Sequence, residues 1–217
     1  MTETVITLEE LERDALTELV NIGVSRAAAS LRKMVGEQVF LSVPSLEVVG
    51  RKLAAALIRE RESDQLIAVR QEFEGAFSGR ALLIFPEANS LELVRAVTGG
   101  ELSSDEVREM EEEALLETGN IVLNGCLATI ANILRKPLTV SLPRLVRGDG
   151  KHLFDASALS ADSGVVLFLY INFAISERDI RGYIAMIMDL PSLEALKVLV
   201  GEFIERIVGP ESATRAN

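Results

Sequence analysis

Two short polar motifs, each a glutamate followed three residues later by an asparagine, stand in the middle of two long helical patterns. The first is Glu18 with Asn21, the second is Glu117 with Asn120, and the chain has no other Glu-x-x-Asn pair. Residues three apart share one face of a helix. An asparagine amide can accept a hydrogen bond from water while its NH2 group donates elsewhere, and a glutamate can pair with a cation. The motif therefore suits a helix face that orients a water molecule and binds a basic group, without a metal of its own.

Both motifs belong to longer polar stripes with a helical period. The stripes contain Asp14, Glu18, Asn21 and Ser25 in the first helix, and Glu113, Glu117, Asn120 and Asn124 in the second. Apolar stripes occupy another face of each helix, so we expect the apolar face to pack on a core and the polar face to point outwards. From residue types alone, a solvated face copied by duplication explains the polar stripes as well as a functional surface does.

The helix interiors contain residues that are poor helix formers. An exposed asparagine in mid-helix costs roughly a few tenths of a kcal/mol relative to alanine, and the sequence offers no packing reason for Asn21 or Asn120. Gly23 and Gly119 cost as much again or more, and they predict the close approach of a neighbouring element.

The two halves of the chain are related by an internal repeat. An offset of 99 residues links Glu18 with Glu117, Asn21 with Asn120, Leu16 with Leu115, Ile22 with Ile121 and Pro44 with Pro143. Further on, Ser-Leu-Glu at 90–92 recurs at 192–194. We interpret this pattern as a tandem duplication.

Each half repeats the same order of predicted elements. We predict long helices at about 7–35 and 104–135, short strands near 38–43, 46–50 and 138–142, weaker helices at 51–60 and 152–159, longer strands at 65–74, 78–85, 164–175 and 180–189, and closing helices at 87–98 and 191–207. Thr7 with Glu10 forms the expected capping box of the first helix, Ser103 or Ser104 caps the second, and Gly36 ends the first.

This order predicts an α+β fold, since short turns between strands favour antiparallel pairing. The fold is a tandem duplication of a helix–strand–helix–strand unit with pseudo-twofold symmetry, in which two long equivalent helices lie outside an antiparallel or mixed sheet. We expect one domain over residues 1–217, with repeats at about 7–98 and 104–207 and a flexible tail at 208–217.

Composition excludes several classes of function. The net charge of −11 over 217 residues disfavours nucleic acid and anionic membranes as partners. The acidic segment 101–117 is either a solvated face or a docking surface. The most apolar run, 164–175, is too short to span a bilayer, and the N-terminus lacks the features of a secretion signal, so we expect a cytoplasmic protein without membrane insertion. Neither His152, the only histidine, nor Cys126, the only cysteine, predicts a metal site.

At these residues the sequence resembles the CheC/CheX/FliY family of chemotaxis phosphatases. The family pattern is Asp or Ser, then Glu four residues on, Asn three further, and a proline about 22 residues later. Asp14, Glu18, Asn21 and Pro44 match it fully. Glu117, Asn120 and Pro143 match it again, whereas Glu113 stands where Asp or Ser is usual. The two-site layout without an added domain is most similar to the CheC branch.

The resemblance implies a monomeric phosphatase that removes the phosphoryl group from the aspartyl phosphate of a CheY-type response regulator. Asn21 and Asn120 would position the attacking water, and Glu18 and Glu117 would dock the regulator's active-site lysine. Flanking contacts would come from Asp14, Ser25, Glu113 and Asn124. The enzyme would need no cofactor of its own, because Mg²⁺ would be carried by the regulator.

The family also implies a CheD-type receptor deamidase as a second partner. The alternative is a non-catalytic module that captures a receiver domain or CheD through the same stripe.

Overall fold

The computed structural model describes residues 7–36, 38–62, 65–97, 103–154, 165–175 and 178–209. The first half contains α1 (Glu10–Val35), β1 (Val39–Ser42), β2 (Leu46–Gly50), α2 (Arg51–Arg61), β3 (Leu66–Gly75), β4 (Gly79–Pro86) and α3 (Glu87–Val97). The second half contains α4 (Ser104–Leu134), β5 (Leu138–Val140), β6 (Arg144–Gly148), α5 (Gly150–Leu153), β7 (Val165–Ile175), β8 (Arg178–Met188) and α6 (Leu190–Val208).

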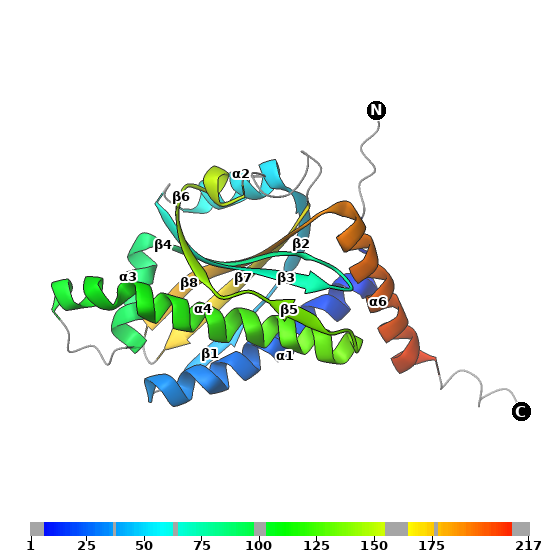
Figure 1. The fold of residues 1–217 in the computed structure, drawn as a ribbon, viewed down its shortest axis with the longest axis horizontal. Coiled ribbons are helices and arrows are strands. Elements are labelled where there is room, and N and C mark those ends of the chain that lie inside the picture. Colours follow the sequence, from blue (N-terminus) through cyan, green and yellow to red (C-terminus); the bar gives the residue numbers. More distant parts are fainter. Residues whose placement is uncertain are drawn as a thin grey trace, which may run out of the picture.

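The described strands form one curled antiparallel sheet of eight strands (Figure 1). The order is β1-β7-β8-β4-β3-β5, with β2 also paired to β7 and β6 also paired to β3. Exchanging each strand for its counterpart in the other half, β1 for β5, β2 for β6, β3 for β7 and β4 for β8, reverses this order and leaves the pattern of pairs unchanged. The predicted α+β duplication with pseudo-twofold symmetry is therefore confirmed.

The approximate twofold axis passes between the two central strands, β4 and β8. Leu83 of β4 pairs with Val69 in its own hairpin, as Ile184 of β8 pairs with Leu169 in the other. Leu83 and Ile184 face each other directly across the β4–β8 pair. Because equivalent residues meet at this point, each half supplies the neighbouring strand that completes the sheet of the other half.

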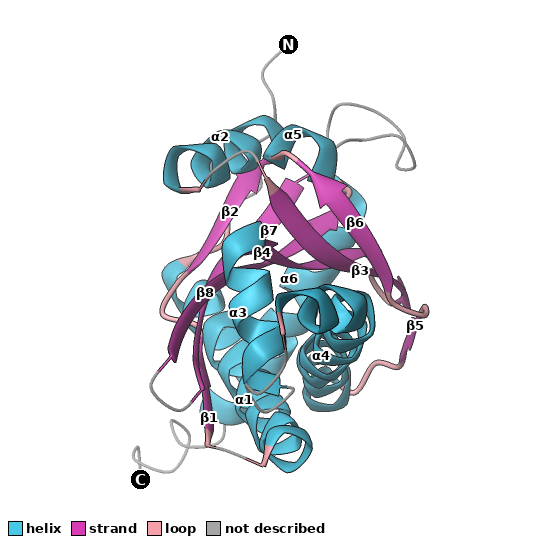
Figure 2. Ribbon diagram, turned by 90° about the vertical axis from the view of Figure 1, so that its left-hand side faces the viewer, coloured by secondary structure: helices cyan, strands magenta, loops and turns pink. Residues whose placement is uncertain are grey.

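Helices cover both faces of the sheet (Figure 2). The long helices α1 and α4 lie on one face together with α3 and α6, and they enclose the larger apolar cluster. The short helices α2 and α5 lie on the other face, over a smaller cluster that includes Ala54, Ile58 and Phe168. Successive residues of a strand point to opposite faces, so each long strand serves both clusters.

The two long helices cross in close contact, which explains one of the glycines. A Cβ on Gly23 would lie 2.7 Å from Cα of Cys126 on α4. A Cβ on Gly119 would lie 2.4 Å from the side chain of Val69 on β3. The predicted role of these glycines, close approach, is confirmed. Residues 109–134 of α4 are long and apolar enough to cross a membrane by length and composition, but half of the best window is buried inside this fold, as in a core helix.

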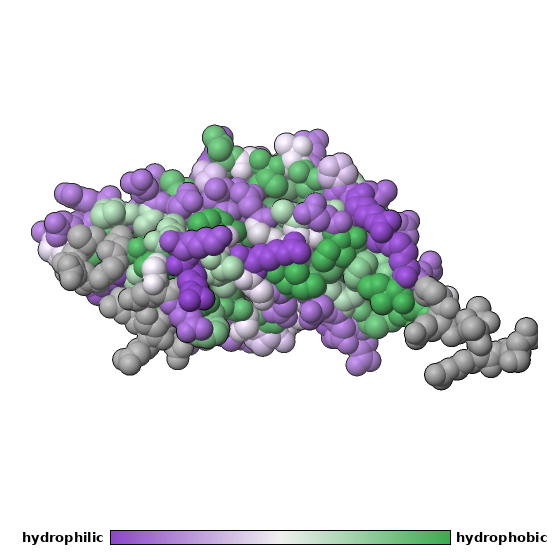
Figure 3. Space-filling view, turned by 90° about the horizontal axis from the view of Figure 1, so that it is seen from below, coloured by the Kyte–Doolittle hydropathy of each residue, from purple (hydrophilic) through white to green (hydrophobic). Residues whose placement is uncertain are grey.

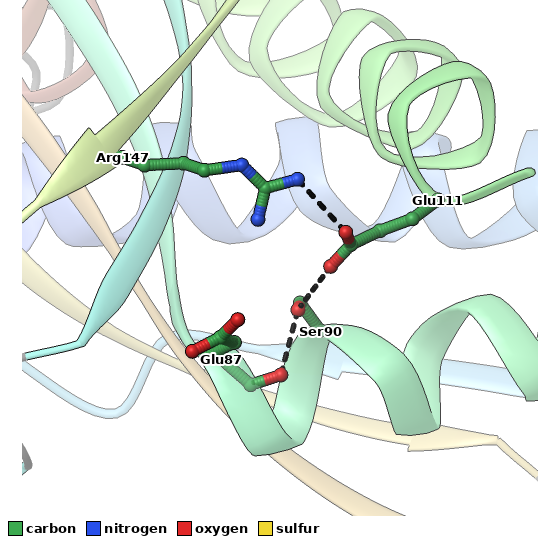
Figure 4. Close-up of polar contacts among 4 residues, drawn as sticks. All are labelled: Glu87, Ser90, Glu111 and Arg147. Atoms are coloured by element: carbon green, nitrogen blue, oxygen red, sulfur yellow. Dashed lines mark hydrogen bonds and ion pairs between the residues drawn. The ribbon is translucent and has the colours of Figure 1, made fainter. Parts of the chain in front are cut away.

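A buried carboxylate holds α4 to its neighbours (Figure 4). Arg147 of β6 donates from Nη2 to Oε2 of Glu111 over 2.8 Å. The Oγ of Ser90 on α3 lies 3.1 Å from Oε1 of Glu111 and 2.7 Å from the carbonyl oxygen of Glu87, and its single proton serves these two acceptors. Glu111 therefore fixes the position of α4 relative to both α3 and the sheet.

Several predicted boundaries need correction. The capping box of α1 is formed by Glu9 and Glu12, not by Thr7 and Glu10, so α1 begins at Glu10. Ser103 with Glu106 caps α4, and Gly36 ends α1 in the left-handed conformation, both as predicted. Strand β6 was not predicted, and α5 occupies Gly150–Leu153. Phe154 ends α5, so the predicted 152–159 helix is wrong at its start, and residues 155–159 lie outside the described residues. Most of the predicted tail, residues 210–217, also lies outside them, and α6 continues to Val208.

Candidate functional site

The predicted site residues lie on the outward parts of α1 and α4, with the amides set deeper than the carboxylates. Exposed side chains are those of Asp14, Glu18, Ser25, Glu113 and Glu117, whereas Asn21, Asn120 and Asn124 are half-buried. Seen from below, the side of the molecule that carries α1 and α4 presents hydrophilic side chains next to apolar patches (Figure 3). Each motif has its own neighbours and therefore forms its own candidate site.

The two motif glutamates are free. Within the described part of the chain, neither Glu18 nor Glu117 makes a hydrogen bond or an ion pair. Their carboxylates are therefore available to a cationic group from outside the molecule.

Asn21 is tied to the backbone of the residue before Pro44. Its Nδ2 donates to the carbonyl oxygen of Val43 over 3.0 Å, and its Oδ1 accepts from the Val43 N–H over 2.9 Å. Val43 is buried and lies just past the end of β1. Buried backbone groups need hydrogen-bond partners, and the amide supplies both. The expectation that Asn21 has no packing reason is therefore wrong, and the spacing between asparagine and proline now has a structural cause.

Asn120 is held differently, through a glutamine on the sheet. Nε2 of the buried Gln71 on β3 lies 3.2 Å from Oδ1 of Asn120 and 3.0 Å from the carbonyl oxygen of Ser141. Asn124 also donates to Oδ1 of Asn120, over 2.7 Å. The carbonyl of Ser141 can only accept, so it requires the NH2 group of Gln71 to face this side. Asn120 too has a packing reason, and its amide points its oxygen inwards.

The two sites therefore leave different amide atoms free. Ser42 pairs with Asn172, and its counterpart Ser141 bonds to Glu72, so Asn172 and Glu72 occupy equivalent positions in the two halves. The residues that precede them are therefore counterparts too, and the counterpart of Gln71 is the apolar Ile171. Asn21 keeps one free acceptor position on Oδ1, because a carbonyl oxygen accepts two hydrogen bonds. On Asn120 both acceptor positions are taken by Gln71 and Asn124.

Sequence reasoning missed Gln71, although a signal was present. Along β3 the side chains that face α1 and α4 are Ile67, Val69, Gln71 and Phe73, so a single polar residue interrupts an apolar alternation. Gln71 is 1% exposed, and its Oε1 is buried without a partner among the described residues. Burying an amide oxygen without a hydrogen-bond partner costs free energy. The two hydrogen bonds that Gln71 donates offset this cost.

A pocket opens beside the second motif. It has a volume of about 600 Å³ and is lined by Glu109, Glu112, Glu113, Leu116, Glu117, Asn120 and Pro143. Four carboxylates around one half-buried amide give this pocket a negative charge. The acidic segment 101–117, which the sequence left open as a solvated face or a docking surface, thus contributes side chains to the pocket beside Asn120.

The loop before the second proline also differs from its counterpart. Leu142 stands where the first half has Val43, but it is 84% exposed whereas Val43 is 2% exposed. Leu142 is thus an exposed apolar side chain directly before Pro143, which lines the acidic pocket.

Two other residues singled out in the sequence lie away from the Glu-x-x-Asn motifs or are buried. Cys126 is fully buried, and burial raises the pKa of its thiol to about 12, so it stays protonated. The side chain of His152 is exposed on α5, and the backbone N–H of His152 donates to the capping carboxylate of Asp149. No three His, Cys, Asp or Glu side chains of the described residues are grouped so that they could hold a metal ion.

Comparison with curated proteins finds distant relatives. The chain is 23% identical over 201 residues to the "Putative CheY-P phosphatase CheC1" of Halobacterium salinarum, covering 85% of this chain and 97% of the relative. It is 21% identical over 204 residues to "CheY-P phosphatase CheC" of Bacillus subtilis, covering 89% and 96%. It is also 24% identical over 140 residues to "Flagellar motor switch phosphatase FliY" of Bacillus subtilis, of which the match spans only 36%. No protein-family model matches the chain.

Comparison with solved structures shows the same fold. FliY of Thermotoga maritima superposes with a TM-score of 0.72 at 14% identity, covering 91% of this chain and all of that one. The FliM middle domain of H. pylori gives a TM-score of 0.59 at 9% identity, covering 88% and 99%. The chain thus has the fold of FliY and FliM and is similar in sequence to CheC and FliY proteins, which supports the resemblance to the CheC/CheX/FliY family.

Proposed function

We propose that this protein hydrolyses the aspartyl phosphate of a CheY-type response regulator, with Asn21 and Asn120 positioning the attacking water. The observation that carries the proposal is the repeated pairing of a free glutamate with a fixed amide, one helical turn away, on both long helices. The names of the CheC relatives, which match over nearly their whole length, support the substrate class.

The reaction requires the enzyme mainly to position the attacking water. An aspartyl phosphate is an acyl phosphate, and its hydrolysis needs a water molecule in line with the departing carboxylate. The water oxygen bonds to phosphorus, the bond from phosphorus to the aspartate oxygen breaks, and the products are inorganic phosphate and a free carboxylate. An amide that holds the water by accepting one hydrogen bond reduces the entropic part of the barrier.

The two amides would reach this arrangement by different routes. Asn21 has a free acceptor position on Oδ1 and can take the hydrogen bond from water directly. Asn120 first has to exchange the bond from Asn124 for one from water, while the bond from Gln71 continues to hold the amide in place. Asn124 thus becomes a resting-state partner of the amide rather than only a flanking contact.

Docking follows from charge and apolar area. Glu18 and Glu117 would each pair with the lysine beside the regulator's phosphorylation site, and Mg²⁺ would be carried by the regulator. The acidic pocket around Asn120 favours a partner surface with positive charge, and Leu142 adds an apolar contact. We place this reaction in the cytoplasm, with the enzyme acting as a monomer.

The decisive experiment measures phosphate release from a phosphorylated receiver at substoichiometric enzyme. Each single variant, Asn21→Ala or Asn120→Ala, should retain partial turnover, and the double variant should lose turnover while it still binds the receiver. A double variant that turns over as fast as the unaltered protein would show that the amides do not position the water.

One observation favours a second function, namely capture of a receiver or of CheD without catalysis. Both acceptor positions of Asn120 are occupied at rest, so the second site could bind a partner without activating water. Under this alternative the unaltered protein binds the phosphorylated receiver at equimolar ratio but leaves its half-life unchanged.

A further inference from the structure

Three arginines meet on the sheet face opposite the Glu-x-x-Asn motifs. Arg70 lies on β3 and Arg80 on β4, and their near neighbours Ala68 and Leu82 belong to the apolar cluster beneath α2 and α5. Arg51 opens α2, which covers the same face. We propose that Arg51, Arg70 and Arg80 form a binding site for a phosphate-class oxyanion.

Strand register brings the two sheet arginines together. Arg80 pairs directly with Glu72, while Arg70 pairs with Leu82, so Arg70 and Arg80 are diagonal neighbours on one face of the β3–β4 pair. Diagonal residues on adjacent antiparallel strands are within reach of long side chains. Arg51 directly follows Gly50, which pairs with Val165 of β7, and Val165 pairs with Met188 of β8. Arg80 pairs with Ile187, the neighbour of Met188, so Arg51 starts α2 close to Arg80. The charges of Arg70 and Arg51 both act on Arg80.

These arginines lack the acceptors that buried cations require. Arg80 is only 5% exposed, and it makes no hydrogen bond or ion pair with any residue that the structure describes. The Nε, Nη1 and Nη2 atoms of Arg51 are all buried, and none of them has a partner there. Among the residues that the structure describes, the carboxylate in contact with these arginines is that of Glu72, which lies 3.8 Å from Nη2 of Arg70 and is 58% exposed.

The electrostatic balance of the cluster is therefore unfavourable without an anion. Burial, followed by the charge of Arg70, lowers the pKa of Arg80, with Glu72 acting in the opposite direction and Arg51 in the same one. A buried charge without a counter-charge costs several kcal/mol in principle, and native proteins rarely leave one unpaired. The simplest way to remove the cost is a bound anion.

The chemistry of the donors selects the class of ligand. Guanidinium groups present paired N–H donors that match the oxygens of phosphate and carboxylate. Three guanidinium groups and one carboxylate leave an excess of two positive charges, and the exposed Arg144 of β6, which pairs with Arg70, adds another at the edge. This excess fits a dianion with several acceptor oxygens better than a monoanionic carboxylate. Arg70 and Glu72 are partly exposed, so a ligand can approach from the edge of the cluster.

The site does not rest on the proposed phosphatase function, and it lies on the other face of the sheet. The two are nevertheless adjacent along β3, because Arg70 directly precedes Gln71, which holds Asn120 on the opposite side. The ligand is expected to stabilise the protein whether or not the protein hydrolyses an aspartyl phosphate.

Calorimetry and thermal unfolding test the proposal with inorganic phosphate, sulfate and a phosphate monoester such as phenyl phosphate. Sodium chloride at matched ionic strength is the reference. We expect saturable binding of at least one of these oxyanions and a rise in Tm above the chloride reference. Arg80→Met and Arg51→Met should each weaken binding at least about tenfold, because each removes charge-assisted hydrogen bonds. Arg59→Met, a matched change at an exposed position of α2, should leave binding unchanged.

Stability without ligand gives a second, independent readout. In buffer free of oxyanions Arg80→Met should be at least as stable as the unaltered protein, because it removes an unpaired buried charge. Binding of the monoester but not of free phosphate would identify the ligand as a phosphorylated group on a larger molecule. The proposal fails if oxyanions stabilise no more than chloride does. It also fails if both arginine variants respond to oxyanions as the unaltered protein does.

Discussion

At the scale of single residues, a backbone carbonyl determines how the amide of Asn120 is oriented. The backbone carbonyl of Ser141 can only accept, which sets the orientation of the Gln71 amide, and Gln71 in turn fixes the oxygen of Asn120. In the first half this intermediate is absent, and Val43 contacts Asn21 directly. The second amide therefore depends on a residue of the sheet that the first does not need.

Changing Gln71 to methionine tests this dependence, because methionine has similar length and no donor. In an Asn21→Ala background, where only the second site can act, we expect kcat to fall about tenfold, as loss of one orienting hydrogen bond of about 1.4 kcal/mol would give. KM for the phosphorylated receiver should stay the same, since the docking groups are untouched. Steady-state phosphate release measures both constants.

The matched control for Gln71→Met is the same substitution in an Asn120→Ala background. There the first site alone acts, and kcat should not change. An equal loss of kcat in both backgrounds would mean that Gln71 only supports the fold.

Leu142 should act in docking rather than in turnover. Replacing it with serine removes an exposed apolar side chain at the rim of the pocket, where burial by a partner is worth roughly 1.5–3 kcal/mol. We expect KM for the receiver to rise about tenfold with kcat unchanged. Leu53→Ser, at an exposed leucine on α2, is the control, and a KM increase of the same size there would contradict a specific contact.

At the scale of elements, the crossing of α1 and α4 requires a residue without a side chain. A methyl group on Gly23 would meet the backbone of Cys126 at 2.7 Å, so the helices would have to move apart. We predict that Gly23→Ala lowers the free energy of unfolding by about 1–3 kcal/mol, as overpacking does. Urea denaturation measures the change.

Gly201→Ala on α6 is the matched helical control for Gly23→Ala. A Cβ there has no heavy atom within 4 Å, so alanine should raise the free energy of unfolding by roughly 0.5–1 kcal/mol through helix propensity. Opposite signs at the two glycines would show that the helix crossing, and not propensity, sets the cost at Gly23. If Gly23→Ala were as harmless as Gly201→Ala, the close crossing would be wrong.

Periodicity predicted the elements better than it predicted their ends. The 3.6-residue pattern of α1 and α4 and the alternation of the long strands follow from burial, because buried positions are occupied by apolar residues. The cap at Glu9 was missed because a threonine is the commoner cap, and β6 was missed because its side chains are only half-buried or exposed. The bonds of Asn21 to Val43 and of Asn120 to Gln71 could not be predicted, since they join residues 22 and 49 positions apart.

At the scale of the whole molecule, the repeat in the sequence predicted the symmetry of the sheet. It did not predict that the symmetry is broken at the sites. That difference depends on Gln71 having the apolar Ile171 as its counterpart in the other half, and on Leu142 being exposed where Val43 is buried. Gln71, one of the residues that break the symmetry, bonds directly to the amide of Asn120 in the second half.

The meeting of Leu83 and Ile184 on the twofold axis has a consequence for how the chain could be divided. In either half alone, the backbone N–H and C=O groups on one edge of the central strand, β4 or β8, would have no partner strand. Each half supplies that partner strand to the other. We predict that residues 1–100 and 101–217, expressed as separate polypeptides, reassemble into a one-to-one heterodimer with native-like stability. Size-exclusion chromatography with light scattering would detect this complementation, and two fragments that remain soluble and separate on mixing would refute it.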